Sequence, residues 1–151
     1  SFLLKRFNYL FNKSETSQSY FQPPLELHEI DYFEEITIND IKINAIKQNH
    51  GVIDTLGFIF NDVFAYCTDV VGFPEKSFEY LRKMKVLIIT GLRQSPHMAH
   101  AHFDLSFEWI AKLNPDVAYL THLSPESDHD VVTKLCPPNT YPAYDGLVID
   151  I

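Results

Sequence analysis

The hydrophobic pattern of this chain changes at Asp69. Before that residue, segments 36–45 and 56–67 consist of short alternating or apolar runs, which predict β-strands. Each segment is interrupted by an Asn-Asp pair, and these residues tolerate the positive φ angles of a tight hairpin turn. After Asp69, short apolar runs alternate with apolar residues at helical spacing. The pattern therefore predicts hairpins followed by strand–helix alternation, which describes a layered α/β domain with the sheet inside and helices outside.

Several strands are expected to be buried. The runs at 56–60 and 63–67 are apolar almost throughout, so we expect both faces of these strands to be covered. Short apolar runs at 86–89 and 117–121 predict two more buried strands, and residues 147–149 predict a closing strand.

Helices are expected between these later strands. Pro74-Glu75 begins the first helix, which carries Phe78 and Leu81 inward. Asp104 is a suitable N-cap for the second helix, which has four apolar residues on one face: Phe103, Phe107, Ile110 and Leu113. Ser124, followed by Pro125, has the N-cap pattern of a third helix that runs through Leu135.

Composition excludes several classes of protein. The 151 residues carry 12 Lys and Arg against 20 Asp and Glu, a net charge of −8, which argues against a basic surface for long nucleic acid or anionic membrane. No apolar run approaches the ~20 residues of a membrane span, and no signal peptide is evident, which favours a cytoplasmic protein. Cys67 and Cys136 are too few and too isolated for a disulfide framework or a Cys-based zinc site.

The N-terminal residues differ from the rest of the chain. Residues 1–24 contain an aromatic cluster, followed from residue 13 by a polar stretch that ends in a Pro pair and is typical of a linker. Strand signals begin after residue 24. We therefore expect an N-terminal segment, 1–24, and one domain, 25–151.

Four residues with metal-binding or acid–base chemistry stand at the ends of expected elements. Asp69 and His122 each follow a buried strand, His50 follows an alternating segment, and His102 begins a helix. Taken singly, each is readily explained as a turn residue or as a histidine bonded to backbone. Taken together, they lie at the edge of the sheet where α/β proteins place their active sites. Imidazole and carboxylate ligands suit borderline divalent metals such as zinc.

An ordered set of motifs makes this pattern specific. The motifs are Asn49-His50-Gly51, Leu56-Gly57-Phe58, Thr68-Asp69, His100-Ala101-His102, Leu120-Thr121-His122-Leu123-Ser124 and Tyr144-Asp145-Gly146-Leu147. Together they resemble the metallo-β-lactamase superfamily, and within it they are most similar to the branch of phosphoribosyl cyclic phosphate phosphodiesterase. The resemblance covers roughly residues 25–151 and implies the C-terminal portion of an αββα sandwich.

The resemblance implies a role for each residue of the set. His50 would bind one metal ion, His122 a second, and Asp69 would bridge both, with two Zn or Mn ions in a complete site. His102 would contact the substrate phosphate and act with Asp69 as a catalytic residue. Asp145 would not bind a metal itself but would contact and orient a ligand histidine.

Other side chains would serve the substrate, which the resemblance implies is a small phosphorylated or nucleotide-like molecule. Arg93 and His100 are candidates for phosphate contacts. His97 is an accessory candidate, because three imidazoles fall within residues 97–102.

One departure from the family pattern limits the function that is expected. The family takes four more metal ligands from a His-x-His-x-Asp-His motif, which this sequence does not contain, and His28 is the only histidine before His50. We expect the chain to be inactive alone and to need a missing N-terminal half or a second copy. The alternatives are a non-catalytic nucleotide- or phosphate-binding module, or an α/β domain with incidental histidines.

Overall fold

The computed structural model describes residues 2–11 and 24–151. The chain divides into two compact units, Ser1–Ile30 and Asp31–Ile151. The described part of the first unit contains two short helices, α1 (Phe2–Arg6) and α2 (Asn8–Phe11). Apart from Pro24, the expected linker at 13–24 lies outside the described residues.

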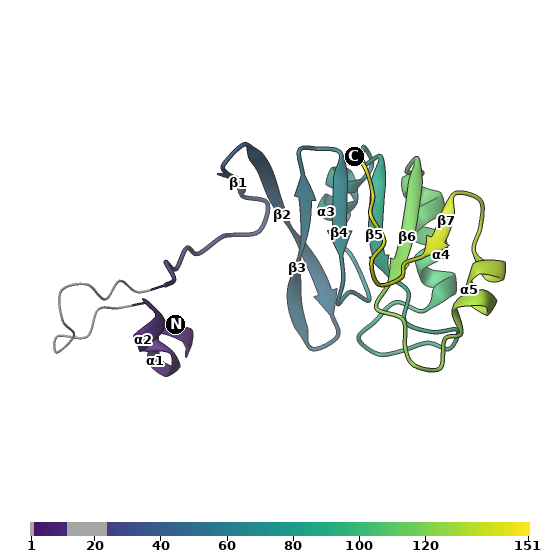
Figure 1. Cartoon of the computed structure of the whole chain (residues 1–151), viewed down its shortest axis with the longest axis horizontal. Coiled ribbons are helices and arrows are strands. Elements are labelled where there is room, and N and C mark those ends of the chain that lie inside the picture. Colours follow the sequence, from purple (N-terminus) through teal and green to yellow (C-terminus); the bar gives the residue numbers. More distant parts are fainter. Residues whose placement is uncertain (1, 12–23) are drawn as a thin grey trace. The chain divides into compact units, whose positions relative to one another are not determined.

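The second unit is built on a mixed β-sheet. In the described residues this sheet has seven strands, and their order in space equals their order in the chain. The strands are β1 (Glu35–Ile38), β2 (Ile41–His50), β3 (Ile53–Phe60), β4 (Phe64–Cys67), β5 (Val86–Thr90), β6 (Val117–Thr121) and β7 (Thr140–Pro142). Strands β1 to β4 pair antiparallel, and β4 to β7 pair parallel (Figure 1).

The two expected hairpins are confirmed. Ile38 pairs with Ile41 across the first turn, where Asn39 has a φ of 53°. Phe60 pairs with Phe64 across the second, where Asn61 and Asp62 have φ of 52° and 55°. Short polar side chains tolerate this left-handed conformation better than other residues, which is why the Asn-Asp pairs end these strands.

Three helices follow β4 in the described residues, and two of them begin elsewhere than expected. They are α3 (Glu75–Leu81), α4 (Phe103–Leu113) and α5 (His129–Leu135). The N-cap of α4 is His102, not Asp104, which lies in the first helical turn.

Helix α5 starts five residues after the predicted cap. Its N-cap is Asp128, whose carboxylate accepts a hydrogen bond of 3.0 Å from the Val131 amide. Ser124 cannot serve as the cap because it belongs to a turn tied to another loop. Its amide donates to the Leu92 carbonyl at 2.8 Å, and its hydroxyl lies 3.2 Å from that of Ser127.

The closing strand is also placed differently. Residues 147–149 form no strand, and the sheet ends instead with β7, which pairs parallel with β6 through Ala118 and Thr140. The Leu147 amide donates locally to the Tyr144 carbonyl at 3.1 Å, so this segment begins as a turn.

The hydrophobic core lies on one face of the sheet. Pairing aligns Ile59, Ala65, Leu87 and Ala118 across four neighbouring strands, and all four are buried. Helices α3 and α4 lie behind the sheet in Figure 1 and supply Phe78, Leu81, Trp109, Ile110 and Leu113 to this core.

The opposite face is more open than expected. Its side chains, which alternate with the core residues, include Phe58, Tyr66, Ile88, Tyr119 and Tyr141. Tyr66 is 40% exposed and Tyr141 49%. The expectation that both faces of 56–67 are covered is therefore wrong for the described chain. One sheet with helices on one face corresponds to one half of the αββα sandwich. No helix in the described residues is long and apolar enough to cross a membrane.

Candidate metal centre

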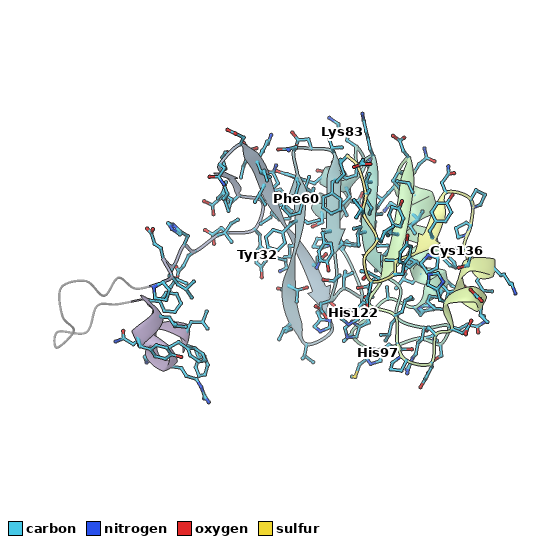
Figure 2. All side chains as sticks on the ribbon, viewed as in Figure 1. Tyr32, Phe60, Lys83, His97, His122 and Cys136 are labelled. Carbon is cyan, nitrogen blue, oxygen red and sulfur yellow. The ribbon has the colours of Figure 1, made fainter. Side chains whose placement is uncertain are left out.

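Three strands deliver side chains to the same edge of the sheet. Strand β2 ends at His50, β4 ends two residues before Asp69, and β6 ends one residue before His122. Because β2, β4 and β6 run in the same direction, their carboxyl ends meet at that edge. His122 and His97 lie there in Figure 2. The edge therefore gathers side chains that are far apart in the sequence.

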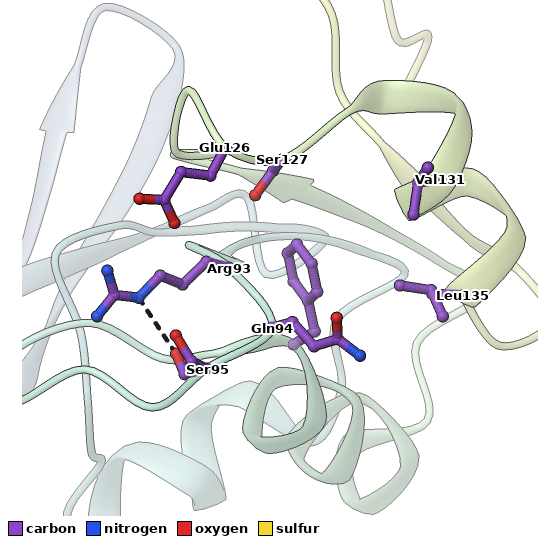
Figure 3. Close-up of a pocket in the computed structure, with 8 residues that line it drawn as sticks. Arg93, Gln94, Ser95, Glu126, Ser127, Val131 and Leu135 are labelled. Atoms are coloured by element: carbon purple, nitrogen blue, oxygen red, sulfur yellow. Dashed lines mark hydrogen bonds between the residues drawn. The ribbon is translucent and has the colours of Figure 1, made fainter.

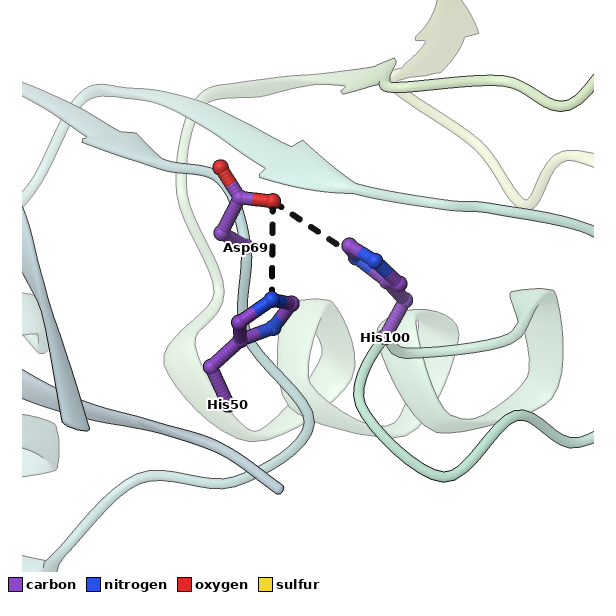
Figure 4. A group of neighbouring side chains, drawn as sticks. All are labelled: His50, Asp69 and His100. Carbon is purple, nitrogen blue, oxygen red and sulfur yellow. Dashed lines mark ion pairs between the residues drawn. The ribbon is translucent and has the colours of Figure 1, made fainter. Parts of the chain in front are cut away.

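One carboxylate oxygen of Asp69 faces three imidazoles. Asp69 Oδ1 lies 4.0 Å from His50 Nε2, 3.8 Å from His100 Nδ1 and 3.7 Å from His122 Nε2. Figure 4 shows the first two of these pairs. The His100 ring stands between the others, with centroid distances of 4.6 Å to His50 and 4.7 Å to His122. We call Asp69, His50, His100 and His122 the Asp69 cluster.

Two members of the cluster have an unusual backbone. Asp69 has a φ of 54° and His122 a φ of 63°, both in the left-handed region. This conformation costs roughly 1–2 kcal/mol for most residues other than glycine, and less for Asp. Such strain persists where the surrounding structure enforces it, and it is concentrated at functional sites.

A backbone contact sets the orientation of His50. Its Nδ1 lies 2.7 Å from the Ala99 carbonyl oxygen, which can only accept, so Nδ1 carries the proton and donates. In the tautomer that is protonated only at Nδ1, the Nε2 lone pair faces Asp69. A ligand histidine in a metal site is held in this way.

His100 is held by its own loop. The His97 Nδ1 accepts hydrogen bonds of 3.2 Å from the amides of Ala99 and His100, which fixes the turn. The His100 Nδ1 is buried and makes no hydrogen bond. A buried ring nitrogen without a hydrogen-bond partner is costly unless another ligand takes it, and a cation is such a ligand.

The donor set of the cluster suits a divalent metal. Ligand atoms of His50, Asp69 and His100 all lie within 4.8 Å of one another. Tetrahedral zinc with bonds of about 2.1 Å would need neighbouring ligands about 3.4 Å apart. A small inward movement of these side chains would reach that spacing. Nitrogen and carboxylate donors fit zinc and also manganese, so the residues present fit the expected group.

The lowered pKa of His100 predicts how the stability of the metal-free chain changes with pH. Burial lowers the His100 pKa from its ordinary 6.5, and the like charges of His122 and His50 lower it further, although Asp69 opposes them. Below the ordinary pKa the unfolded chain binds a proton at this ring while the folded chain still does not. We therefore expect the free energy of unfolding to decrease as the pH falls from 6.5 toward the depressed pKa. Urea unfolding of the metal-free chain at several pH values would measure this decrease.

The His100→Gln variant isolates this contribution. Its free energy of unfolding should depend less on pH over the same interval. An unchanged pH dependence in this variant would show that His100 is not the responsible group.

Other sequence-predicted residues lie outside the Asp69 cluster. His102 is the N-cap of α4, where its backbone carbonyl accepts from Ser106, and His100 takes the place in the cluster that we had expected of His102. The Arg93 guanidinium donates to the carbonyls of Ser95 and Pro96, each at 3.3 Å.

Two hollows adjoin this edge of the sheet. Arg93 lines one of about 470 Å³ with Gln94, Glu126 and Leu135 (Figure 3). Asp145 is exposed and shares the other, of about 390 Å³, with His122 and Tyr144. No contact between Asp145 and a histidine ring is seen in the described chain. Both hollows are large enough for a small substrate, and the second is lined by a residue of the cluster, His122.

Comparison with known proteins agrees with the fold. Residues 3–123 match the family model described as "Beta-lactamase superfamily domain". A crystal structure of "a New Diphosphatase from the PhnP Family" is 30% identical with a TM-score of 0.79, covering 83% of this chain and 49% of its own. No curated protein sequence matches the chain.

Two further solved structures resemble the fold alone. The metallo-β-lactamase fold protein YhfI from Bacillus subtilis is 16% identical with a TM-score of 0.65, covering 97% of this chain and 61% of its own. The CmlA β-hydroxylase E377D mutant is 11% identical with a TM-score of 0.59, covering 80% and 33%. The chain thus spans between a third and three-fifths of the length of these three structures.

Proposed function

The chain belongs to the β-lactamase superfamily, and on this premise we propose that it is part of a metal-dependent hydrolase that cleaves phosphodiester or cyclic phosphate bonds. The observation that carries the proposal is the Asp69 cluster, in which one carboxylate oxygen lies within 4.0 Å of three imidazole nitrogens. Two of its four residues have a left-handed backbone, a conformation found at functional sites as well as in turns.

Each member of the cluster has a chemical task in this proposal. His50 offers Nε2 as a ligand, because its Nδ1 is engaged by Ala99. Asp69 would supply negative charge to a bound cation, and His122 Nε2 lies 3.7 Å from the same carboxylate oxygen. A bound divalent cation would supply an activated water nucleophile and positive charge for phosphate oxygens.

His100, a sequence-predicted candidate for phosphate contact, has a task in the cluster as well. Its ring lies between those of His50 and His122, and its lowered pKa keeps it neutral near pH 7. A neutral imidazole at this place can bind a cation or donate a hydrogen bond to a phosphate oxygen.

The substrate class follows from the surroundings and from the relative. The 30% identical protein is a diphosphatase, which supports a substrate that contains phosphate. The hollow that His122 shares with Asp145 and the one lined by Arg93 provide room for a small phosphorylated or nucleotide-like molecule. Arg93 would have to release its carbonyl partners to reach a phosphate.

We further propose that the chain is inactive by itself. The sequence contains no His-x-His-x-Asp-His motif, so the four donors of the Asp69 cluster would have to hold the metals alone. An incomplete set of ligands binds metal weakly, because it fixes neither geometry nor charge. A second polypeptide segment or a second copy of this chain would complete the site.

A non-catalytic phosphate-binding module is the second candidate. It is favoured by the small number of donors together with hollows that do not depend on a metal. The two candidates differ in whether the ligand requires the metal to bind.

Metal and phosphate binding test the two candidates together. Titration with Zn²⁺ and Mn²⁺ should show weak binding of fewer than two ions per chain, with no turnover of bis-p-nitrophenyl phosphate or cyclic nucleotides. Binding of a phosphodiester that appears only with metal supports the hydrolase proposal. Binding without metal supports the module, and turnover by the chain alone would contradict its inactivity.

A further inference from the structure

A polar pair next to the Asp69 cluster, the buried Gln48 and the half-buried Thr55, is not predicted by the sequence pattern. Gln48 lies on β2, two residues before His50, and its side chain is fully buried. Its Nε2 donates to the Thr68 carbonyl at 2.8 Å and to the Thr55 hydroxyl at 3.3 Å. The Thr55 hydroxyl in turn donates to the Asp69 carbonyl at 2.8 Å. A continuous chain of donors therefore reaches the backbone of the central carboxylate residue.

The two accepting carbonyls flank the strained residue. The Thr68 carbonyl belongs to the peptide before the Asp69 Cα and the Asp69 carbonyl to the peptide after it. Holding both peptides restricts φ and ψ of Asp69 together. Each hydrogen bond favours this left-handed conformation over alternatives in which its donor and acceptor separate. The pair can therefore offset the strain that turns the carboxylate toward the histidines.

The neighbouring backbone completes this restraint. The Val71 amide donates to the Asn49 carbonyl, and the Asn49 amide donates to the Gly72 carbonyl, both at 2.8 Å. Three consecutive residues of β2 thus contact the turn at 68–72. Gln48 binds the start of this turn and Asn49 binds its end. His50 faces the Asp69 side chain in between.

Gly57 makes room for the Gln48 side chain. A Cβ atom at this position would lie 2.5 Å from Gln48 Oε1 and 3.1 Å from Cys67 Sγ. Gln48 Oε1 accepts no hydrogen bond although it is buried, which costs free energy. An apolar side chain would avoid that cost, so the residue is explained by its donor group and not by packing.

We infer that Gln48 and Thr55 are positioning residues that hold Asp69 in its left-handed conformation and so orient the carboxylate toward His50, His100 and His122. The consequence of this positioning role for metal binding rests on the proposed function, but the effect on the Asp69 backbone does not. In the described chain, the side-chain hydrogen bonds of both residues go to each other and to the Thr68 and Asp69 carbonyls. Their effect passes through two backbone carbonyls.

Three variants and one control test this inference in the whole chain. Thr55→Val removes the hydroxyl with little change in shape, Thr55→Ser retains it, and Gln48→Leu removes the amide donor. Ser77→Ala is the control, because the buried Ser77 hydroxyl also bonds to a β2 carbonyl, that of Lys47 at 2.6 Å, but not to the Asp69 turn.

The readouts are the backbone of Asp69 and the affinity for zinc. The carbonyl and Cα chemical shifts of Thr68 and Asp69 should change in Thr55→Val and Gln48→Leu, and return toward the original values in Thr55→Ser. Zinc affinity should fall about tenfold in Thr55→Val and Gln48→Leu, as it does when other groups that orient metal ligands are removed. Ser77→Ala should lose stability without either change.

The outcomes separate this inference from the proposed function. If the shifts of Asp69 change but the unaltered chain binds no zinc, the positioning role stands and the hydrolase proposal fails. If the shifts and zinc affinity in Thr55→Val match those of Ser77→Ala, the positioning role is wrong. Should Gln48→Leu fail to fold, the Thr55 pair of variants decides the question alone.

Discussion

Replacing Asp69 with Asn should weaken zinc binding by more than about a hundredfold while the chain keeps its fold, since even residues that only orient ligands cost 10–100-fold when altered. The reason is that Asp69 supplies the one negative charge among the three imidazoles of the cluster. Removing that charge leaves neutral nitrogen donors around a divalent cation. Isothermal titration with Zn²⁺ measures the loss.

Asparagine is the replacement that tests charge alone. It has nearly the shape of aspartate, and it accepts the φ of 54° found at this position. The thermal midpoint of the metal-free variant should therefore stay close to that of the original chain. Asp104→Asn is the matched control, because Asp104 is exposed in the first turn of α4, away from the cluster. Equal zinc affinity in both variants would remove Asp69 from the metal site.

Local sequence patterns predicted the sheet well and the helix starts less well. The Asn-Asp pairs predict hairpins because left-handed backbone is a local preference, and both hairpins form there. A helix cap depends instead on where the side chain finds a partner. Ser124 has the sequence of a cap, but its turn is tied to Leu92, and Asp128 caps α5 in its place.

In the candidate site, too, some residues could be predicted from local sequence and others could not. His50, Asp69 and His122 could be predicted because they follow strands whose ends meet at one edge of the sheet. His100 and His102 lie in a loop with no periodicity, so spacing does not decide which ring turns inward. The structure brings His100 to Asp69.

The residues that hold Asp69 left no signal in the sequence. Gln48 looks like any polar residue of an alternating strand, and such residues usually face solvent. Only the pairing of β2 with β3, which places Gln48 opposite Thr55, shows that it is buried beside the Thr68–Asp69 turn. Burial of a polar side chain is set by tertiary structure, which a single sequence does not display.

The second large effect, a loss of stability, is expected when Trp109 is truncated, because Trp109 lies in the core on the covered face of the sheet. Trp109 is 6% exposed, and its ring lies 4.9 Å from that of Phe73, which in turn packs on Phe78 of α3. Trp109→Ala should leave a cavity between the helices and the sheet and reduce the free energy of unfolding by about 3–5 kcal/mol. Because small domains have only about 5–15 kcal/mol in total, this variant should lose a large fraction of its stability. Urea unfolding followed by circular dichroism measures the change.

Tyr66→Ala supplies the contrast on the open face. Tyr66 lies on β4 and is 40% exposed, so its loss should cost less than about 1 kcal/mol in the isolated chain. If both substitutions cost the same, the open face is covered in solution. Sedimentation equilibrium would then show whether a second copy covers it, since self-association makes apparent stability depend on protein concentration. A monomer with equal losses at both positions would contradict the one-sided sheet described above.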